Sequence, residues 1–176
     1  AELYELQGDT TRTRGVFQRG EKKAEACGDA GFFQSWALFE LRQFPGCYSL
    51  PSPVTPYVVS TTDKRTAGIA AVEASAAGQE VNKTTSEVAR VHSIARRLFK
   101  KAVTVNKFHS ASWVAWAKHE QRAGNRDVAR RLLITGIANF PHSKNIGWFH
   151  GALASLSRED GDLLTARACY NRAVQA

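Results

Sequence analysis

Long apolar runs and cysteines are both scarce in this sequence of 176 residues, and each shortage excludes a class of protein. No apolar run approaches the roughly 20 residues that a bilayer-spanning helix needs, so we expect no membrane span. Cys27, Cys47 and Cys169 are an odd number without metal-ligand spacing, which favours a reducing compartment over a disulfide framework.

Recognisable catalytic motifs are also missing. The chain contains no GxSxG, Walker A, GxGxxG or CxxC pattern, and His119-Glu120 is followed by Ala123 where HExxH requires a second histidine. The five histidines are scattered, and we assign them structural or surface positions. The sequence therefore predicts a protein that is not an enzyme, with no cofactor, no metal site and no small-molecule substrate.

What the chain does contain is a repeated pair of helical patterns. Apolar residues recur at helical spacing around Ala95 and Phe99, and a second apolar stripe follows around Trp113 and Trp116. The first pattern begins again at Ala129, 34 residues after Ala95, an interval typical of stacked helical hairpins. We therefore expect a solenoid, and one that belongs to a longer parent chain, because terminal repeats normally carry a polar capping face.

A short motif, Gly-[Asp/Asn]-x3-[Ala/Thr]-Arg, marks the helix boundaries. Its three copies begin at Gly8, Gly124 and Gly161. Its glycine supplies the left-handed backbone position that ends a helix, and its small residue lets the next helix pack closely. These signals predict an all-α fold without a sheet, with helices over residues 11–25, 32–43, 88–105, 111–122, 126–139, 144–157 and 163–175.

These residues resemble the HAT (half-a-tetratricopeptide) repeat. Its first helix carries a tryptophan and a glutamate, and its second helix carries Ala-Arg, an aromatic residue and a basic residue. The first-helix pattern is present as Trp36 with Glu40 and as Trp116 with Glu120. The second-helix pattern reads Thr13-Arg14, Phe17, Arg19; Ala95-Arg96, Phe99, Lys101; and Ala166-Arg167, Tyr170, Arg172, whereas the copy at Ala129-Arg130 has Leu133 and Thr135 instead. The resemblance covers residues 1–44 and 88–176 and implies a right-handed α-solenoid of antiparallel hairpins.

Within that family, the segment SWVAWAKHEQRAGN is most similar to the plastid HAT proteins that bind and protect photosystem transcripts. The resemblance implies RNA binding, transcript stabilisation or RNA processing, and a chloroplast location, with the nucleus as the alternative.

Between the two groups of repeat helices the composition changes. Residues 45–87 contain Pro51, Pro53 and Pro56, many Ser, Thr and Ala, and few large side chains. Thr13 and Ala95 are 82 residues apart, so about 48 residues are inserted within one hairpin. We expect a flexible insertion with at most a short helix over 68–77; it is either an idle surface loop or a docking segment for a partner.

The net charge of +8 is concentrated in one segment. Residues 90–131 hold eleven Lys and Arg against Glu120 and Asp127, which leaves the rest of the chain near neutral. Equivalent positions of a solenoid lie on one surface, so this concentration predicts a positive field suited to a polyanion.

The candidate phosphate-binding residues are the cations outside the Ala-Arg motif. They are Arg90, Arg97, Lys100, Lys101 and, 34 residues after Arg97, Arg131. The same residues are also compatible with a solvated charged face or with an acidic protein partner. We expect the motif arginines to pair with first-helix glutamates instead, and the tryptophans to pack between helices, with Trp113 the best candidate for base stacking.

Two functions compete on this reading. The first is a repeat segment that binds single-stranded RNA, with a basic ladder following the phosphate backbone. The alternative is a protein scaffold inside an RNA-processing or photosynthetic assembly, which grips partner proteins and uses charge only for steering.

Overall fold

The computed structural model describes residues 9–44, 70–141 and 143–175, and of residues 70–85 the backbone alone. These residues form seven helices and no strand, which confirms the all-α fold class. The helices are α2 (Thr10–Ala26), α3 (Ala30–Arg42), α4 (Ala70–Val105), α5 (Ser110–Arg122), α6 (Arg126–Asn139), α7 (Ile146–Glu159) and α8 (Leu163–Gln175). Six of the seven predicted helices match these bounds to within two residues.

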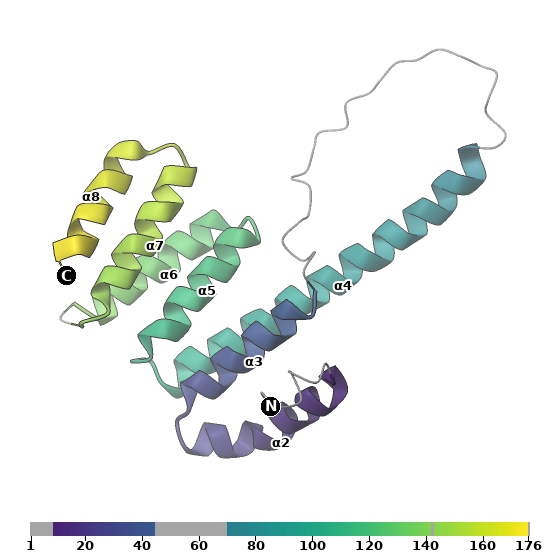
Figure 1. Cartoon of the computed structure of the whole chain (residues 1–176), viewed down its shortest axis with the longest axis horizontal. Coiled ribbons are helices and arrows are strands. Elements are labelled where there is room, and N and C mark those ends of the chain that lie inside the picture. Colours follow the sequence, from purple (N-terminus) through teal and green to yellow (C-terminus); the bar gives the residue numbers. More distant parts are fainter. Residues whose placement is uncertain (1–8, 45–69, 142, 176) are drawn as a thin grey trace, which may run out of the picture.

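The helices pack in adjacent pairs: α3 lies against α4, α5 against α6, and α7 against α8 (Figure 1). Each of α2, α4 and α6 also contacts the helix that follows it, and we call these three contacts junctions. The first helices of the pairs touch in sequence as well, α3 with α5 and α5 with α7.

Glycines end the helices where the sequence indicated. Gly124 and Gly161 have φ of +82° and +83°. Gly28, which belongs to no copy of the glycine motif, has φ of +73°. The residue after each glycine donates its N–H to a carbonyl five residues earlier, which caps the helix end. Gly8, the first predicted copy, lies outside the described residues.

Helix α4 is longer than predicted. It begins at Ala70, inside the segment expected to be an insertion over 45–87, and not near Val88. The reason is local propensity: AAVEASAAGQEV is rich in alanine, the strongest helix former, although it offers few large side chains for a core. Residues 45–69 of the predicted insertion lie outside the described part of the chain.

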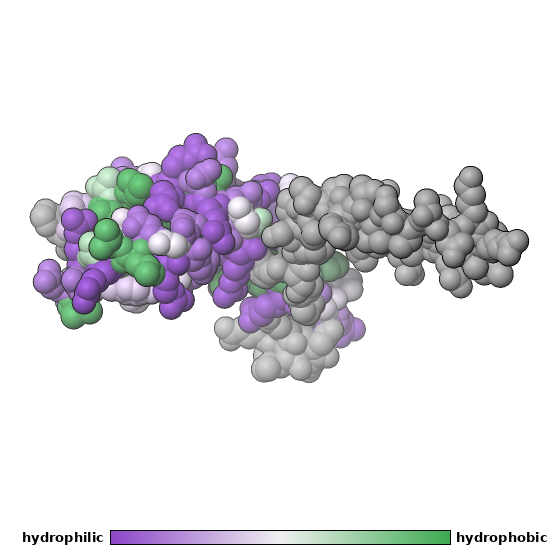
Figure 2. Space-filling view, turned by 90° about the horizontal axis from the view of Figure 1, so that it is seen from above, coloured by the Kyte–Doolittle hydropathy of each residue, from purple (hydrophilic) through white to green (hydrophobic). Residues whose placement is uncertain are grey.

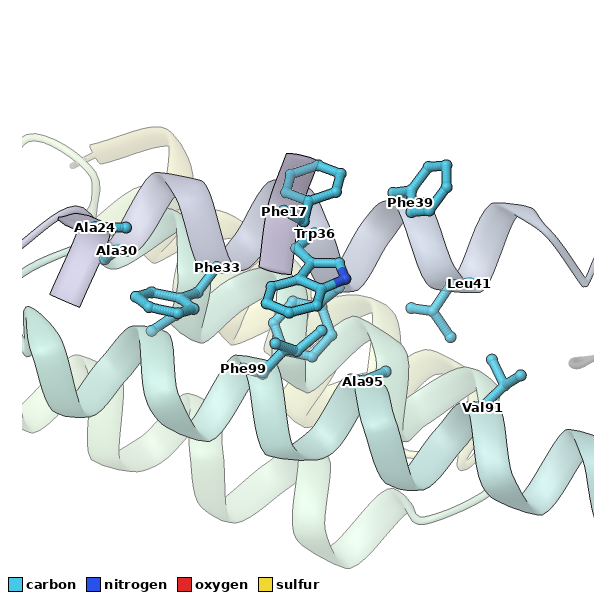
Figure 3. Close-up of a cluster of buried hydrophobic side chains, with 13 residues drawn as sticks. Phe17, Ala24, Ala30, Phe33, Trp36, Phe39, Leu41, Val91, Ala95 and Phe99 are labelled. Carbon is cyan, nitrogen blue, oxygen red and sulfur yellow. The ribbon is translucent and has the colours of Figure 1, made fainter. Parts of the chain in front are cut away.

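A first core fills the space between α2, α3 and α4 (Figure 3). Trp36 is 4% exposed and stacks on Phe17, with ring centroids 5.6 Å apart and planes 5° from parallel. Phe33 and Phe99 lie fully buried on the facing sides of α3 and α4. Five aromatic residues of this core are buried: Phe17, Phe33, Trp36, Phe39 and Phe99.

A second core joins α5, α6 and α7 around Leu133, Phe140 and Phe149. Here Gly136 admits the Phe149 ring so closely that a Cβ at position 136 would overlap it. The α2–α3 junction repeats the arrangement, because a Cβ on Gly20 would lie 2.9 Å from the Phe32 ring.

At the α4–α5 junction the corresponding residues are Ala102 and Ser112, both buried. At the α2–α3 and α6–α7 junctions, the space that a glycine leaves on one helix is therefore filled by a phenylalanine ring of the next, whereas the α4–α5 junction has two small residues at these positions.

Candidate nucleic-acid interface

Four of the five predicted phosphate-binding cations are exposed on α4 and α6: Arg90, Arg97, Lys100 and Arg131. Arg97 and Arg131 each follow a fully buried alanine by two residues, so they occupy the same position in their helices. Within the described part of the chain, neither these two arginines nor Lys100 forms an ion pair. Lys100 lies three residues from Arg97, which places both side chains on neighbouring surface of one helix.

Lys101 is held by acidic residues that the sequence placed far away. Its ammonium lies 2.8 Å from a Glu21 carboxylate oxygen and 3.0 Å from one of Glu25, and 5.2 Å from the centre of the Phe33 ring. The hydrogen bonds that Lys101 donates to these two carboxylates raise its pKa. Lys101 thus connects α2 to α4 through these ion pairs, and its role in phosphate binding stays a prediction.

Local pairing reduces the charge concentration counted from the sequence. Among the cations over 90–131, those within salt-bridge distance of a described carboxylate include Arg96, Lys101, Arg126 and Arg130. The carboxylates paired with Lys101, Arg126 and Arg130 come from outside that segment. Arg90 lines a small hollow beside Glu87 and the Arg14–Glu40 pair, so acidic groups also lie near its charge. The exposed cations that form no ion pair within the described residues include Arg97, Lys100 and Arg131.

The motif arginines behave as predicted at two junctions. Arg14 donates two hydrogen bonds to Glu40, at 2.8 and 2.7 Å, and Arg96 donates two to Glu120, at 2.7 and 3.0 Å. The indoles of Trp36 and Trp116 donate to the same carboxylates, and Asn125 adds a further bond to Glu120.

Burial alone would raise the pKa of Glu120, but its three donors outweigh burial and hold the pKa below the ordinary value. These arginines are therefore structural, and they are separate from the exposed cations Arg97, Lys100 and Arg131.

At the third junction the pattern changes. Arg130 donates to Asp160 at 2.6 Å, at the end of α7, and Arg126 shares that carboxylate at 2.7 Å. The position equivalent to Glu120 is Ser157, which is fully buried and whose Oγ has no hydrogen-bond partner among the described residues.

The tryptophan exposed to solvent is Trp148, at 56%, and not the predicted Trp113. Trp113 is half-buried against the second core and donates its indole N–H to the Lys107 carbonyl at 3.0 Å. Trp148 was detectable in the sequence, because it stands out of register with the repeated tryptophans. The positions equivalent to it in the two preceding first helices are Gly31 and Ala111.

Trp148 borders a groove of about 610 Å³ across the first helices of the pairs. Small residues of α5 and α7, among them Ala111, Ala115 and Gly151, line it together with Lys118. A second hollow shares Lys118 and continues past Arg122 and Glu159. An apolar floor with a few polar groups at its edge is typical of a binding groove.

The described residues contain no group of three His, Cys, Asp or Glu able to hold a metal ion. None of the described helices combines the length and apolar character required to cross a membrane. Comparison with family models, with curated proteins and with solved structures found no match to this chain.

Proposed function

We propose that the chain is an RNA-binding segment of a HAT-like helical-repeat protein, in which α3–α4, α5–α6 and α7–α8 are successive hairpins of an α-solenoid. Single-stranded RNA lies along the second helices, and the protein acts in RNA processing or in stabilising a transcript. The observation that carries this proposal is the equivalent placement of Arg97 and Arg131, exposed and clear of described acidic partners. Guanidinium groups of this kind suit phosphate oxygens because they offer several donors at once.

The test replaces Arg97, Lys100 and Arg131 together with Gln. Affinity for a single-stranded RNA oligonucleotide at low salt should fall at least about tenfold, because each lost phosphate contact removes a counterion-release contribution. The matched control replaces three exposed lysines elsewhere on the surface, Lys22, Lys23 and Lys144, with Gln. Its net charge equals that of the first variant. Thermal unfolding of both variants should stay near that of the parent, since all six side chains are exposed.

Equal weakening by the two triple variants would show a general effect of charge, and unchanged binding in the first variant would contradict the proposed interface. A parent chain that binds no single-stranded RNA would contradict the function itself.

The groove beside Trp148 favours a second candidate, a protein scaffold that grips a peptide segment across α5 and α7. The two candidates differ in their response to salt. RNA affinity depends steeply on salt concentration, whereas a mostly apolar peptide contact changes little. Replacing Trp148 with Ala should weaken such a peptide contact and leave the salt slope of RNA binding unaltered.

A further inference from the structure

The groove beside Trp148 changes character along its length. Its first part has a floor of small residues, Ala115, Gly151 and Ala152, with the 56% exposed Trp148 side chain at its edge. Its second part is the hollow that shares Lys118, and polar and charged side chains line it. Figure 2 shows apolar residues gathered at the end of the molecule that α7 and α8 form, on an otherwise largely hydrophilic surface. The groove therefore joins an apolar part to a polar part.

The face that carries this groove stays open from one helix pair to the next. Ser35 and Leu38 of α3 occupy the positions of Ala115 and Lys118 on α5, and both are exposed although five described helices follow α3. Lys118 is exposed in the same way, although α6, α7 and α8 follow it. Successive helices in the described chain therefore leave this face uncovered, and the groove is accessible to a ligand.

Lys118 lies where the two parts of the groove meet. It lines both hollows, and it forms no ion pair within the described residues. Arg122 lies one turn further along α5, in the polar part. Glu159 also lines the polar part, and its carboxylate accepts a hydrogen bond from the Gln121 side chain at 2.8 Å. Two cations against one carboxylate leave the polar part with a single excess positive charge, which is complementary to one acidic side chain.

The distance between the two parts sets the spacing that a ligand needs. Ser155 lines both hollows together with Lys118, and it follows Trp148 by seven residues on α7. Seven residues of a helix rise about 10 Å. An extended peptide covers about the same distance in three residues. An apolar side chain against Trp148 and a carboxylate at Lys118 would therefore lie three positions apart in an extended peptide.

We propose that this groove binds an extended segment of a partner protein in which an apolar residue is followed, three residues later, by Asp or Glu. The apolar side chain packs on the small residues of the floor beside Trp148, and the carboxylate accepts a hydrogen bond from Lys118. The proposal rests on the protein scaffold, the second candidate function, and it specifies the sequence that the scaffold recognises.

A nucleic-acid strand fits this groove less well. Phosphates repeat along a whole strand, whereas the cations of the groove lie in one part only and Glu159 lies beside them. The small apolar residues of the floor offer no side-chain donors to phosphate oxygens. A peptide with one apolar and one acidic side chain meets the matching part of the groove with each.

The test of the charge contact selects peptides from a phage-displayed library of random nonapeptides on the immobilised chain. The selected sequences should share an apolar residue and an acidic residue three positions later. On Lys118→Glu the same selection should replace the acidic residue with Lys or Arg, because the reversed charge rejects a carboxylate. Lys144→Glu, at an exposed lysine outside the groove, is the matched control and should keep the acidic preference.

The test of the apolar contact uses a selected peptide labelled with fluorescein, with binding followed by anisotropy. Trp148→Ala should weaken binding at least about tenfold, because aromatic anchors commonly carry a large share of the binding energy. Tyr170→Ala, at an exposed aromatic residue outside the groove, is the matched control and should leave binding unchanged. Thermal unfolding of both variants should stay near that of the parent, since both side chains are exposed.

Three results would overturn the proposal. The selection could enrich no common sequence, Trp148→Ala could bind the peptide as tightly as the parent, or Lys118→Glu could keep the acidic preference. Displacement of the peptide by single-stranded RNA, from the parent and from the Arg97, Lys100 and Arg131 variant alike, would assign the groove to RNA. Concentration-dependent dimerisation that Trp148→Ala abolishes would assign it to a second copy.

Failure of this proposal can be told apart from failure of the proposed functions. Peptide binding that survives both Trp148→Ala and Lys118→Glu would contradict the groove but leave a scaffold that uses another surface. Absence of any peptide binding would contradict the scaffold itself. The RNA proposal uses exposed cations of α4 and α6 and is measured without peptide, so neither result affects it.

Discussion

The α4–α5 junction and the α6–α7 junction are equivalent in the order of the helices but hold their helices together by different interactions. At the first, Glu120 is buried and accepts bonds from Arg96, Trp116 and Asn125. At the second, Leu153 and Ser157 take the places of Trp116 and Glu120, and the ion pair moves to exposed Asp160.

This difference separates what the fold requires from what it tolerates. The tight fit of Gly136 against Phe149 recurs as Gly20 against Phe32, whereas two small buried residues, Ala102 and Ser112, occupy the equivalent positions of the α4–α5 junction. The buried carboxylate, in contrast, is present at two junctions of three. A small residue at this position of the second helix is therefore common to the three junctions, whereas the buried carboxylate is a polar interaction that the α6–α7 junction does without.

The largest expected effect is the loss of the arginine at the α4–α5 junction. Arg96→Met should destabilise the protein by about 2–4 kcal/mol, because it leaves Glu120, with a side chain 2% exposed, without its main partner. The upper part of the usual range is excluded since the Arg96 side chain is itself 43% exposed. Arg130→Met should cost under about 1 kcal/mol, since Asp160 is more exposed and keeps Arg126. Urea denaturation measures both, and equal costs would contradict the contrast between the junctions.

Acid should weaken the α4–α5 junction next. Burial lowers the pKa of His119 to about 4, against an opposing effect of Glu120 and with support from the positive charges nearby. As the pH falls below about 6.5, the unfolded chain binds a proton that the folded chain takes up only near pH 4. Stability should therefore drop by up to roughly 3 kcal/mol over this window.

Glu120 adds to the loss at lower pH, because its depressed pKa contributes stability only while the carboxylate remains ionised. Urea denaturation of the parent and of His119→Gln at pH 7.5, 6 and 5 checks the assignment to His119. The His119→Gln variant should lose much less stability between pH 7.5 and pH 5 than the parent, and an identical loss would assign the effect elsewhere.

A smaller effect tests the volume match. Gly136→Ala should destabilise by about 1–3 kcal/mol, because the new methyl group overlaps the Phe149 ring. Gly151→Ala, also in a helix but with open space around it, should be neutral or stabilising by up to about 1 kcal/mol. Combining Gly136→Ala with Phe149→Leu should cost less than the two single changes together; additive costs would argue against direct contact as the cause.

The smallest predicted change concerns the buried hydroxyl of the α6–α7 junction. Ser157→Ala should leave stability unchanged or raise it by about 0.5–1 kcal/mol, because the Oγ is buried without a hydrogen-bond partner in the described residues. Thermal unfolding against the parent measures it, with exposed Ser93→Ala in α4 as a control. A loss above about 1 kcal/mol would show that Ser157 makes a bond that the junction needs.

The helix bounds and the Arg–Glu pairs could be predicted because each depends on residues close in sequence or equivalent between repeats. The glycine motifs end α5 and α7 as expected. The spacing Trp36-x3-Glu40 places the indole and the carboxylate on one side of α3. The start of α4 at Ala70 differs from the prediction because the alanine-rich residues 70–81 have high helix propensity despite their low hydrophobicity.

The candidate site was only partly predictable. Lys101 pairs with glutamates 76 and 80 positions away in the sequence, and the partner of Arg130 directly follows α7, so helical spacing alone could not separate paired cations from exposed ones. The groove beside Trp148 also depends on how α5 and α7 meet, which no local pattern encodes.

The most direct test of the RNA proposal is the salt dependence of single-stranded RNA binding by the parent chain and by the Arg97, Lys100 and Arg131 triple Gln variant. A plot of log affinity against log salt should lose about 0.7 of slope per phosphate contact removed, and thus about 2 in all. The variant with Lys22, Lys23 and Lys144 replaced should keep the parent slope. Identical slopes for the parent and the Arg97 variant, with both folded, would contradict RNA binding by this face.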